Sequence, residues 1–347
     1  MARTRAMLTA GVLVTGLLAA CGGAAAGGPD GTGGVGVVRI GYFPTLTHAP
    51  ALVAEREGYL RDRLGPGVTT QSFAAGPGVI QAVFSGSLDI AYLGPNPTIT
   101  AYVQSGGAAI RVIAGATSGG ASLVVRRELD DPGDLRGRTL ATPQLGNTQD
   151  VALRNWLSRN GMRADTEGGG DVRIVPQRNA AALQAFVSGH IDGAWVPEPY
   201  ATQFVDRGAR VLVDERSLWD GGRFVTTNVI VRTAFLDEHP DRVAAFLEAH
   251  LDALRLLADD PARAKADVVA QLRTLTGQDL DPAVVDRAWD NLTFLADPLP
   301  ATLIRSAEHA HAVGLLEDLP ADDLAGLWDL DPLNRALRAR DLPEVTP

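Results

Sequence analysis

Several residue types are scarce in this chain of 347 residues, and each shortage excludes a class of chemistry. The single cysteine, Cys21, excludes an intramolecular disulfide, and its place near the N-terminus leaves no cysteine for catalysis in the rest of the chain. Lysine occurs once, at Lys265, and the net charge is −10. Proteins that bind nucleic acid carry a basic stripe, so we expect no nucleic-acid partner.

The sequence also lacks the short motifs of common enzyme and metal sites. It contains no G-x-S-x-G, no Walker A loop and no H-E-x-x-H. His309 and His311 lie two positions apart on a predicted helix, so their side chains diverge and do not chelate one metal. We therefore expect no metal, no cofactor and no catalytic residue.

Long apolar runs are absent as well, apart from a short one at the N-terminus. The run at 7–20 is too short to span a bilayer as a permanent helix, and the arginines before it are typical of a secretory signal. It ends in LAAC at 18–21, which resembles a bacterial lipobox, in which the cysteine carries the lipid. We predict a lipoprotein signal peptide at 1–21, lipid attachment at Cys21 and a glycine-rich flexible tether at 22–36.

This N-terminal pattern predicts where the protein is located. The mature chain is exported and held by its lipid at the outer face of the cytoplasmic membrane, which is the periplasmic side in a bacterium with two membranes. The lipid anchor is then its one expected contact with a membrane.

What the sequence does contain is an internal repeat. Residues 81–91 read QAVFSGSLDIA and residues 184–194 read QAFVSGHIDGA, with six of eleven residues identical. The copies are about one hundred positions apart, which is the size of a small domain. Each copy reads as a helix that ends at Ser-Gly, followed by a short strand. The repeat therefore predicts two lobes of similar α/β plan with a cleft between them.

Strands and helices alternate over 37–116 and again over 139–213, which predicts parallel sheets covered by helices. Turn-rich stretches near 126–134 and 221–227 suit crossovers between the lobes. We assign 37–126 and 227–347 to lobe I, which is discontinuous and carries a helical C-terminal tail, and 127–226 to lobe II. Four helices are expected in the tail, each beginning with proline, at 240–257, 261–275, 282–291 and 300–313.

Candidate binding residues follow the carboxyl ends of the predicted strands, where open α/β sheets bind ligands. Small polar residues and glycines are concentrated there, and several of the turns open into helices, whose N-termini attract anions. The candidates are Thr45, Thr47, His48, Gly76, Gly94, Asn96, Ser118, Asn147, Thr148, Gln149, Trp195 and Glu198.

Other interpretations of some of these residues stay open. Thr47, Asn147 and Thr148 are also good helix caps. Trp195 is either a core aromatic or, together with its repeat partner Tyr92, a ring that lines the cleft. Glu198 is either a solvated carboxylate or a ligand contact.

Two acidic residues recur in the repeat without being binding candidates. Asp89 and Asp192 precede their strands, at the amino ends, so we interpret both as structural residues.

Several segments together resemble the substrate-binding proteins of bacterial ABC importers, most closely the sulfonate, taurine and nitrate group. The resemblance covers roughly 37–250 and rests on the segments RIGYFPTLTHAPALVA at 39–54, SFAAGPGVIQAVFSGSLDIAYLGPNP at 72–97, DLRGRTLATPQLGNTQDVALRNWL at 134–157, GHIDGAWVPEPYA at 189–201 and FLDEHP at 235–240. It implies a type II periplasmic-binding-protein fold, with two α/β lobes that close on a ligand. It also implies a monomer that delivers a small anionic solute to an ABC permease and its ATPase.

The ligand that the resemblance implies is an organosulfonate, either an alkanesulfonate or a taurine-like compound. Many sulfonate binders of this group have Asp-Pro where this chain has Pro197-Glu198-Pro199, and thiamine-precursor binders of related fold also use Glu-Pro. Nitrate, bicarbonate and a thiamine-pyrimidine precursor therefore stay open as ligands. An enzyme on the same scaffold and a receptor that signals through a membrane partner are the remaining alternatives.

Overall fold

The computed structural model describes residues 37–319 and 324–347. The predicted signal peptide, the lipid attachment at Cys21 and the tether at 22–36 fall outside the described residues, so they stay predictions.

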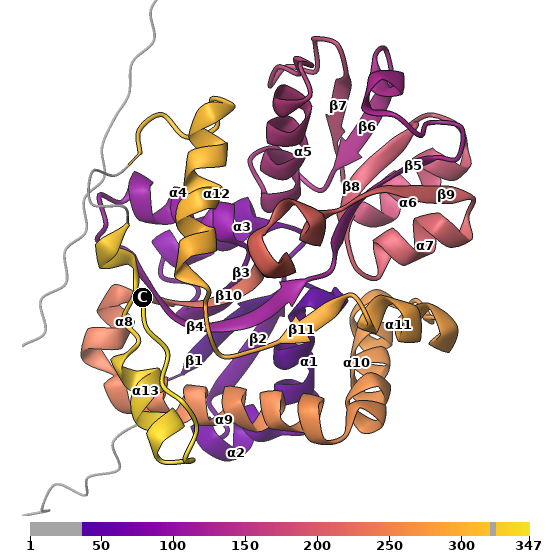
Figure 1. The fold of residues 1–347 in the computed structure, drawn as a ribbon. Coiled ribbons are helices and arrows are strands. Elements are labelled where there is room, and N and C mark those ends of the chain that lie inside the picture. Colours follow the sequence, from indigo (N-terminus) through magenta and orange to yellow (C-terminus); the bar gives the residue numbers. More distant parts are fainter. Residues whose placement is uncertain (1–36, 320–323) are drawn as a thin grey trace, which may run out of the picture. The chain divides into compact units, whose positions relative to one another are not determined.

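The first sheet has six strands, in the order β11-β4-β10-β3-β1-β2 (Figure 1). Strands β1, β2 and β3 run parallel, and β10 pairs antiparallel with both β3 and β4. The strands are β1 (Val38–Tyr42), β2 (Val68–Ser72), β3 (Ile90–Leu93), β4 (Ile110–Gly119), β10 (Val225–Arg232) and β11 (Leu292–Phe294).

The second sheet has five strands, in the order β7-β6-β8-β5-β9. It repeats the plan of the first sheet, because β6, β7 and β8 run parallel and β5 pairs antiparallel with both β8 and β9. In each sheet, one strand that lies between two antiparallel neighbours, β10 or β5, follows a crossing from the other sheet. The strands are β5 (Ala121–Arg126), β6 (Thr139–Thr142), β7 (Arg173–Pro176), β8 (Gly193–Pro197) and β9 (Ala209–Asp214).

The first crossing lies earlier in the chain than the sequence suggests. We expected lobe I to extend to residue 126, but β5 already pairs in the second sheet. The chain crosses at Gly119 and Gly120, whose φ angles of 80° and 74° favour glycine. Strand propensity does not reveal which sheet a strand joins, so the boundary near residue 126 needs this correction. The second crossing lies between β9 and β10.

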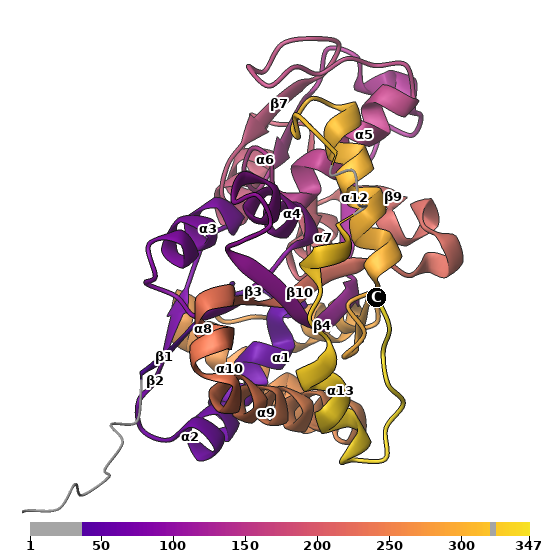
Figure 2. The ribbon, with the colours of Figure 1, turned by 90° about the vertical axis from the view of Figure 1, so that its left-hand side faces the viewer.

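Helices cover the sheets, as the alternation of elements predicts (Figure 2). We call the six-stranded sheet, with α1–α4 and the C-terminal helices, the first lobe, and the five-stranded sheet, with α5–α7, the second lobe. The helices before the C-terminal part are α1 (Ala49–Arg56), α2 (Tyr59–Leu64), α3 (Gly76–Phe84), α4 (Pro95–Gln104), α5 (Thr148–Arg159), α6 (Asn179–Val187) and α7 (Tyr200–Asp206).

The C-terminal part contains the four predicted proline-initiated helices, α9 (Pro240–Asp259), α10 (Pro261–Thr276), α11 (Pro282–Trp289) and α12 (Pro300–Ala312). The structure adds α8 (Thr233–Glu238), α13 (Asp331–Arg338) and strand β11, which we did not predict. Helices α9 and α10 pack on α1, as expected for a tail that returns to the first lobe.

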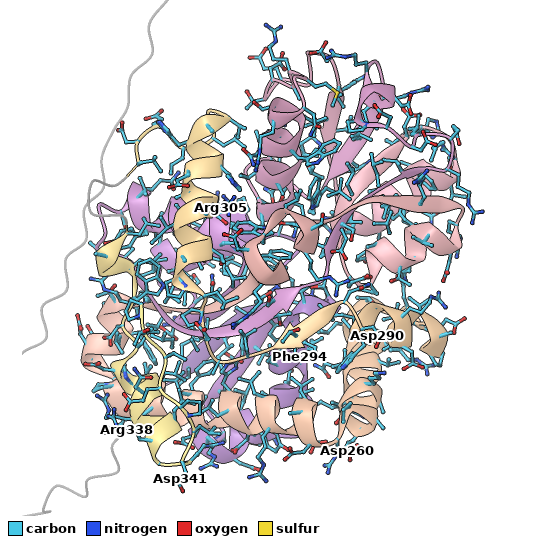
Figure 3. The ribbon with its side chains drawn as sticks, viewed as in Figure 1. Asp260, Asp290, Phe294, Arg305, Arg338 and Asp341 are labelled. Atoms are coloured by element: carbon cyan, nitrogen blue, oxygen red, sulfur yellow. The ribbon has the colours of Figure 1, made fainter. Side chains whose placement is uncertain are left out.

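Two helices of this part also contact the second lobe. Helix α12 packs against α4 and α5, and α11 packs against α7. Arg305, labelled on α12 in Figure 3, lies 3.5 Å from Asp220 in the second crossing. The tail therefore connects the lobes in addition to covering the first one.

The repeated aspartates confirm the correspondence between the lobes. Asp89 accepts a hydrogen bond from the backbone N–H of Arg39 in β1, at 3.0 Å. Asp192 accepts one from the backbone N–H of Thr139 in β6, at 2.9 Å. Each carboxylate thus joins the third parallel strand of its sheet to the first, which is the structural role predicted for both.

Among the helices of residues 37–319 and 324–347, none combines the length and the apolar composition that crossing a membrane requires.

Candidate functional site

A small pocket lies where the carboxyl ends of the parallel strands of both lobes meet. Its volume is about 40 Å³. A cavity needs roughly 10–15 Å³ by this measure to hold one water, so the enclosed space suits a small group of a few heavy atoms. The pocket is lined by Phe43, Thr45, Thr47, His48, Ala74, Ala75, Gly76, Gly94, Pro97, Pro143, Asn147, Thr148, Gln149, Asn179, Pro197 and Thr226.

Four helices begin at this pocket, two from each lobe. Helices α3 and α4 start next to Gly76 and Gly94, and α5 and α6 start next to Thr148 and Asn179. The starts of α3, α4 and α6 have no side-chain cap. The first N–H groups of a helix have no partner within the helix, and the helix dipole is positive at that end. The starts of α3, α5 and α6 therefore form a site that favours an anion, and α4 adds mainly its dipole, because Pro95 and Pro97 in its first turn have no N–H.

The α5 start is built differently, because Asn147 caps it. Its Oδ1 accepts a hydrogen bond from the backbone N–H of Asp150 at 3.0 Å, and its Nδ2 donates to Gln149 Oε1 at 3.0 Å. The capping role that we had kept open for Asn147 is thus present. Because Asn147 holds the oxygen of Gln149, the amide nitrogen of Gln149 is the atom of that side chain left to act as a donor.

His48 adds a neutral donor. The backbone N–H of Phe43 donates to His48 Nδ1 at 3.2 Å, so the proton of the neutral ring is on Nε2. Burial lowers the pKa of His48 to about 3, which keeps the ring neutral at physiological pH. Among the described residues, Nε2 has no hydrogen-bond partner, so this N–H can donate to a ligand.

The described residues that line the pocket include no Asp, Glu, Lys or Arg. Arg178, which directly precedes α6, is exposed and does not line the pocket. The lining therefore offers a ligand neutral donors and helix starts, and no partner for an ion pair.

Eight of the twelve candidate residues line this pocket: Thr45, Thr47, His48, Gly76, Gly94, Asn147, Thr148 and Gln149. They come from four segments of the sequence that the fold brings together. Thr45 and Thr47 share a hydrogen bond, with their hydroxyl oxygens 3.0 Å apart. At Gly94 the lobes nearly touch, because a Cβ atom there would lie 2.5 Å from Thr148 Oγ1.

Two other candidates, Asn96 and Ser118, do not line the pocket, and their polar atoms make hydrogen bonds within the protein. Asn96 Nδ2 donates to the backbone oxygen of Ser306 in α12, at 3.0 Å. Ser118 lies within β4, where its Oγ accepts from the backbone N–H of Phe224 at 3.2 Å. We expected a turn at Ser118, but β4 extends through Gly119 because it pairs with both β10 and β11.

The predicted aromatic lining needs a correction. Trp195 is fully buried, and its Nε1 donates to Glu215 Oε2 at 2.7 Å in the core of the second lobe. Tyr92 is fully buried in the first lobe, with its hydroxyl 2.9 Å from His250 Nδ1. Both rings lie on core-facing positions of their strands, because alternate residues of a strand face opposite sides.

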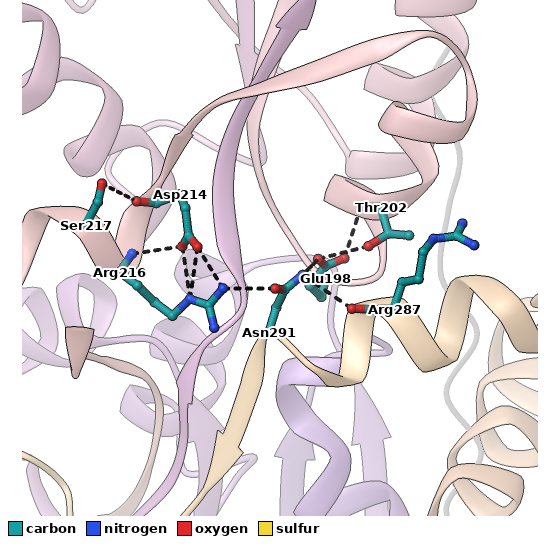
Figure 4. Close-up of polar contacts among 7 residues, drawn as sticks. All are labelled: Glu198, Thr202, Asp214, Arg216, Ser217, Arg287 and Asn291. Atoms are coloured by element: carbon teal, nitrogen blue, oxygen red, sulfur yellow. Dashed lines mark hydrogen bonds and ion pairs between the residues drawn. The ribbon is translucent and has the colours of Figure 1, made fainter. Parts of the chain in front are cut away.

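Glu198 also differs from the expectation of a ligand contact or a solvated loop residue. It is buried, its Oε2 accepts from the backbone N–H of Thr202 at 3.1 Å, and its Oε1 accepts from Thr202 Oγ1 at 3.0 Å. Asn291, which precedes β11 of the first lobe, donates through Nδ2 to Oε1 at 2.7 Å (Figure 4). Glu198 therefore connects the two lobes.

The same asparagine extends this connection to the second crossing. Asn291 Oδ1 accepts from Arg216 Nη2 at 3.1 Å, and Arg216 pairs with Asp214 at 2.7 Å (Figure 4). The backbone oxygen of Glu198 accepts from the N–H of Leu46 in the first lobe, at 3.2 Å. We call Glu198, Asn291, Arg216 and Asp214 the closure network.

The other eight lining residues were not among the candidates: Phe43, Ala74, Ala75, Pro97, Pro143, Asn179, Pro197 and Thr226. Thr226 belongs to β10, which reaches the pocket only because it returns from the second lobe, and no local pattern signals this. Phe43 directly follows β1 and packs 4.5 Å, centroid to centroid, from the ring of His48. Its place at a strand end was the available signal.

Comparison with known proteins gives one family and several relatives. The sequence profile of the NMT1-like family matches residues 34–273. The taurine-binding periplasmic protein of Escherichia coli is 29% identical over 207 residues, which cover 59% of this chain and 62% of that protein. A Bacillus subtilis protein named as an aliphatic sulfonates-binding protein is 27% identical over 307 residues, covering 86% of each chain. The match to the taurine-binding relative thus spans less than two thirds of its length.

Among solved structures, the periplasmic nitrate-binding protein of Synechocystis is similar, with a TM-score of 0.75 and 16% identity. The match covers 88% of this chain and 89% of that one. At this identity the likeness concerns the fold alone, and it confirms the predicted type II periplasmic-binding-protein fold.

Proposed function

The chain belongs to the NMT1-like family, and on that premise we propose that it is the solute-binding component of an ABC importer. Its ligand in this proposal is a small organosulfonate or a similar oxyanion, bound between the lobes and delivered to a membrane permease. The predicted signal peptide and lipid would hold this receptor outside the cytoplasmic membrane, near its permease. Taurine-binding and sulfonates-binding relatives support the ligand class.

One observation carries the proposal: four helices from two lobes begin at a pocket that has no charged lining residue. A sulfonate has three acceptor oxygens and no proton at neutral pH. Free N–H groups at helix starts satisfy such oxygens without a counter-cation. The Nε2–H of His48 and the amide of Gln149 supply two further donors of fixed orientation.

The organic part of a sulfonate needs apolar neighbours. Phe43, Pro97, Pro143 and Pro197 supply them within the lining, in place of the two aromatics that the repeat suggested. Burial of the organic part against these residues adds affinity in proportion to the apolar area covered. A longer organic part requires the lobes to close less tightly than they do around this pocket.

Nitrate is the second candidate, and the size of the enclosed pocket favours it. A volume of about 40 Å³ suits a planar anion with one central atom at least as well as a sulfonate with an organic part. A pyrimidine precursor fits less well, because a substituted ring is larger than a single oxyanion group and has no negative charge for the helix starts to stabilise.

Release to the permease follows from the connections between the lobes. The chain crosses between the sheets twice, so the lobes can rotate about these crossings to open the pocket. The closure network stabilises the closed form, and a permease that opens it would release the ligand. An enzyme on this scaffold has less support, since the described lining residues include no cysteine, serine, lysine or carboxylate, and His48 has one ring nitrogen already occupied by the N–H of Phe43.

The test is a binding screen by thermal shift, followed by calorimetry, with alkanesulfonates, nitrate, bicarbonate and a pyrimidine precursor. A ligand that binds only the folded protein raises its melting temperature. We expect an alkanesulfonate or another of the oxyanions to bind. Gln149→Ala should weaken its binding by about 1–3 kcal/mol, as for a lost hydrogen bond to a charged group. Gln184→Ala, at an exposed position on α6, is the matched control. A screen that finds only neutral or cationic ligands contradicts the proposal.

A further inference from the structure

The chemistry of the pocket lining indicates which sulfonates would bind, an inference that rests on the proposed function. The described lining residues include neutral donors, alanines, prolines and one phenylalanine, but no carboxylate. An aminosulfonate such as taurine is a zwitterion, and its ammonium group needs an acceptor, preferably a charged one, when it leaves water.

The acidic side chains closest along the chain to lining residues are already occupied. Asp150 is fully buried, pairs with Arg154 at 3.0 Å and accepts from Thr142 Oγ1 at 2.8 Å. It also accepts from the backbone N–H of Gly146 at 3.0 Å, so that N–H is used within the protein.

Glu198 follows the lining residue Pro197, but its oxygens accept from Thr202 and Asn291. An ammonium ion would have to displace Asn291 and break the closure network in order to reach Glu198. The amine contact that we had considered for Glu198 therefore opposes closure of the lobes instead of accompanying it.

The helix dipoles that face the pocket repel a cation. The side-chain acceptors in the lining are neutral, among them the threonine hydroxyls and the side-chain oxygen of Asn179, which is buried with no partner among the described residues. A neutral acceptor compensates a desolvated ammonium group less than a carboxylate does. The positive ends of four helices point at the pocket, and the ring nitrogen left for a ligand on His48 is the protonated one, Nε2. The same features that attract the sulfonate oxygens therefore disfavour a second group with positive charge a few ångströms away.

We propose that this pocket selects oxyanions whose organic part carries no positive charge, and that it discriminates against zwitterionic aminosulfonates. The substrate class is then that of simple alkanesulfonates and hydroxyalkanesulfonates, with small inorganic oxyanions as competitors.

A matched pair of ligands tests this by calorimetry on the intact protein. Isethionate and taurine differ only in carrying a hydroxyl or an ammonium group on the same two-carbon sulfonate. At pH 7 isethionate binds at least tenfold more tightly than taurine. Taurine then gains affinity as the pH rises through the pKa of its amine, roughly 8–10, while isethionate stays unchanged.

An isosteric variant reverses the preference. Asn179 lies in the first turn of α6, where a carboxylate is compatible with the helix dipole, so Asn179→Asp retains the fold. It brings a negative charge to the lining, raises the affinity for taurine relative to isethionate at least tenfold and removes the pH dependence. Gln278→Glu adds the same charge at an exposed position outside the lining and leaves the ratio unchanged.

The outcomes separate this inference from the proposed function. If taurine binds as tightly as isethionate at pH 7, or more tightly, the inference is wrong and the proposed function stands. If no sulfonate and no other oxyanion binds, the proposed function is wrong, and the inference falls with it. If Asn179→Asp and Gln278→Glu shift the ratio equally, the selectivity does not come from the lining, and the inference is also wrong.

Discussion

The two copies of the repeat fold into the same helix–strand unit, but the residues that follow the strand have different roles in the two copies. In the first copy, β3 leads through Gly94 directly into α4, and in the second, β8 leads through Pro197 and Glu198 into α7. Gly94 and Pro197 occupy corresponding positions, and both line the pocket. The residue after each differs: Pro95 starts a helix, whereas Glu198 joins the closure network. One copy thus places a helix start at the pocket, and the other connects the lobes through Glu198.

The aromatic residues of the two copies also differ, because each hydrogen-bonds a different kind of titratable partner in the core of its lobe. Tyr92 hydrogen-bonds His250, and Trp195 hydrogen-bonds Glu215. Burial lowers the pKa of His250 to about 4, although its bond to the backbone oxygen of Gly115 opposes this, and burial raises the pKa of Glu215 to about 7. The hydrogen-bond partners of these two equivalent strand positions, His250 and Glu215, therefore have pKa values shifted in opposite directions.

The largest expected effect follows from these opposed groups. Glu215 has its full stabilising effect below its unfolded pKa of 4.5 and loses it as the pH rises through about 7. Replacing it, as in Glu215→Gln, should make the free energy of unfolding rise more steeply with pH across this window than in the parent protein. Between the two ends of this pH window, the change in the free energy of unfolding should be about 3 kcal/mol larger in the variant than in the parent protein. Denaturant titrations at a series of pH values measure this slope.

His250 provides the comparison within the same experiment. Because its folded pKa lies below its unfolded value of 6.5, it destabilises the fold as the pH falls from 6.5 towards 4. His250→Gln should therefore flatten the pH dependence by a similar amount, whatever its effect on absolute stability. Equal slopes in the parent and both variants would show that these buried groups do not titrate as their surroundings imply.

The next largest effect concerns the first copy and its contact with the second lobe. Gly94 has an ordinary φ of −72°, so alanine fits its backbone, but the added Cβ would lie 2.5 Å from Thr148 Oγ1. Gly94→Ala should weaken ligand binding at least tenfold, about 1.4 kcal/mol, by hindering closure while leaving the melting temperature of the free protein nearly unchanged.

A double variant separates closure from direct contact in this case. Thr148→Ala removes the atom that meets the new Cβ, so Gly94→Ala should cost much less in its background. If the two effects simply add, the lobes do not approach each other at Gly94 in the bound protein.

A smaller effect is expected in the second copy. Asn291→Ala removes the hydrogen bond from the first lobe to Glu198 and the acceptor of Arg216. In the open form water replaces these partners, so the substitution should stabilise the open form relative to the closed form by roughly 1 kcal/mol. Ligand affinity should then fall about fivefold. Calorimetry measures the affinity, and an unchanged value would remove the closure network from the account.

The smallest effect is expected at a neighbouring surface ion pair between the lobes. Arg287 pairs with Asp206 at 2.6 Å, but both side chains are largely accessible to solvent. Because such pairs contribute little, Arg287→Ala should change affinity by less than about 0.5 kcal/mol. A loss as large as that of Asn291→Ala would mean that this pair, and not the buried network, dominates closure.

Local sequence patterns predicted much of the fold, because most of its elements are encoded locally. The repeat predicted two similar lobes, and the prolines at the starts of α9, α10, α11 and α12 predicted those helices. Glycines and small polar residues after strands predicted eight of the residues that line the pocket, because strand ends converge in this class of fold.

The remaining features depend on contacts between segments that are distant in sequence. The sheet that β5 joins, and the arrival of Thr226 at the pocket, depend on how the chain returns between lobes. The burial of Trp195 depends on which face of β8 meets the core, and the role of Glu198 depends on Asn291. No local pattern around any of these residues carries that information.

The central claim is that helix starts from both lobes hold the anion through their backbone N–H groups. Amide proton shifts measured by NMR during titration with ethanesulfonate test it directly. We expect the amide protons of Gly76, Thr148 and Asn179 to move downfield together, at one dissociation constant, while amides at the start of α10 stay in place. Saturable binding that leaves the starts of α3, α5 and α6 unshifted would contradict the account.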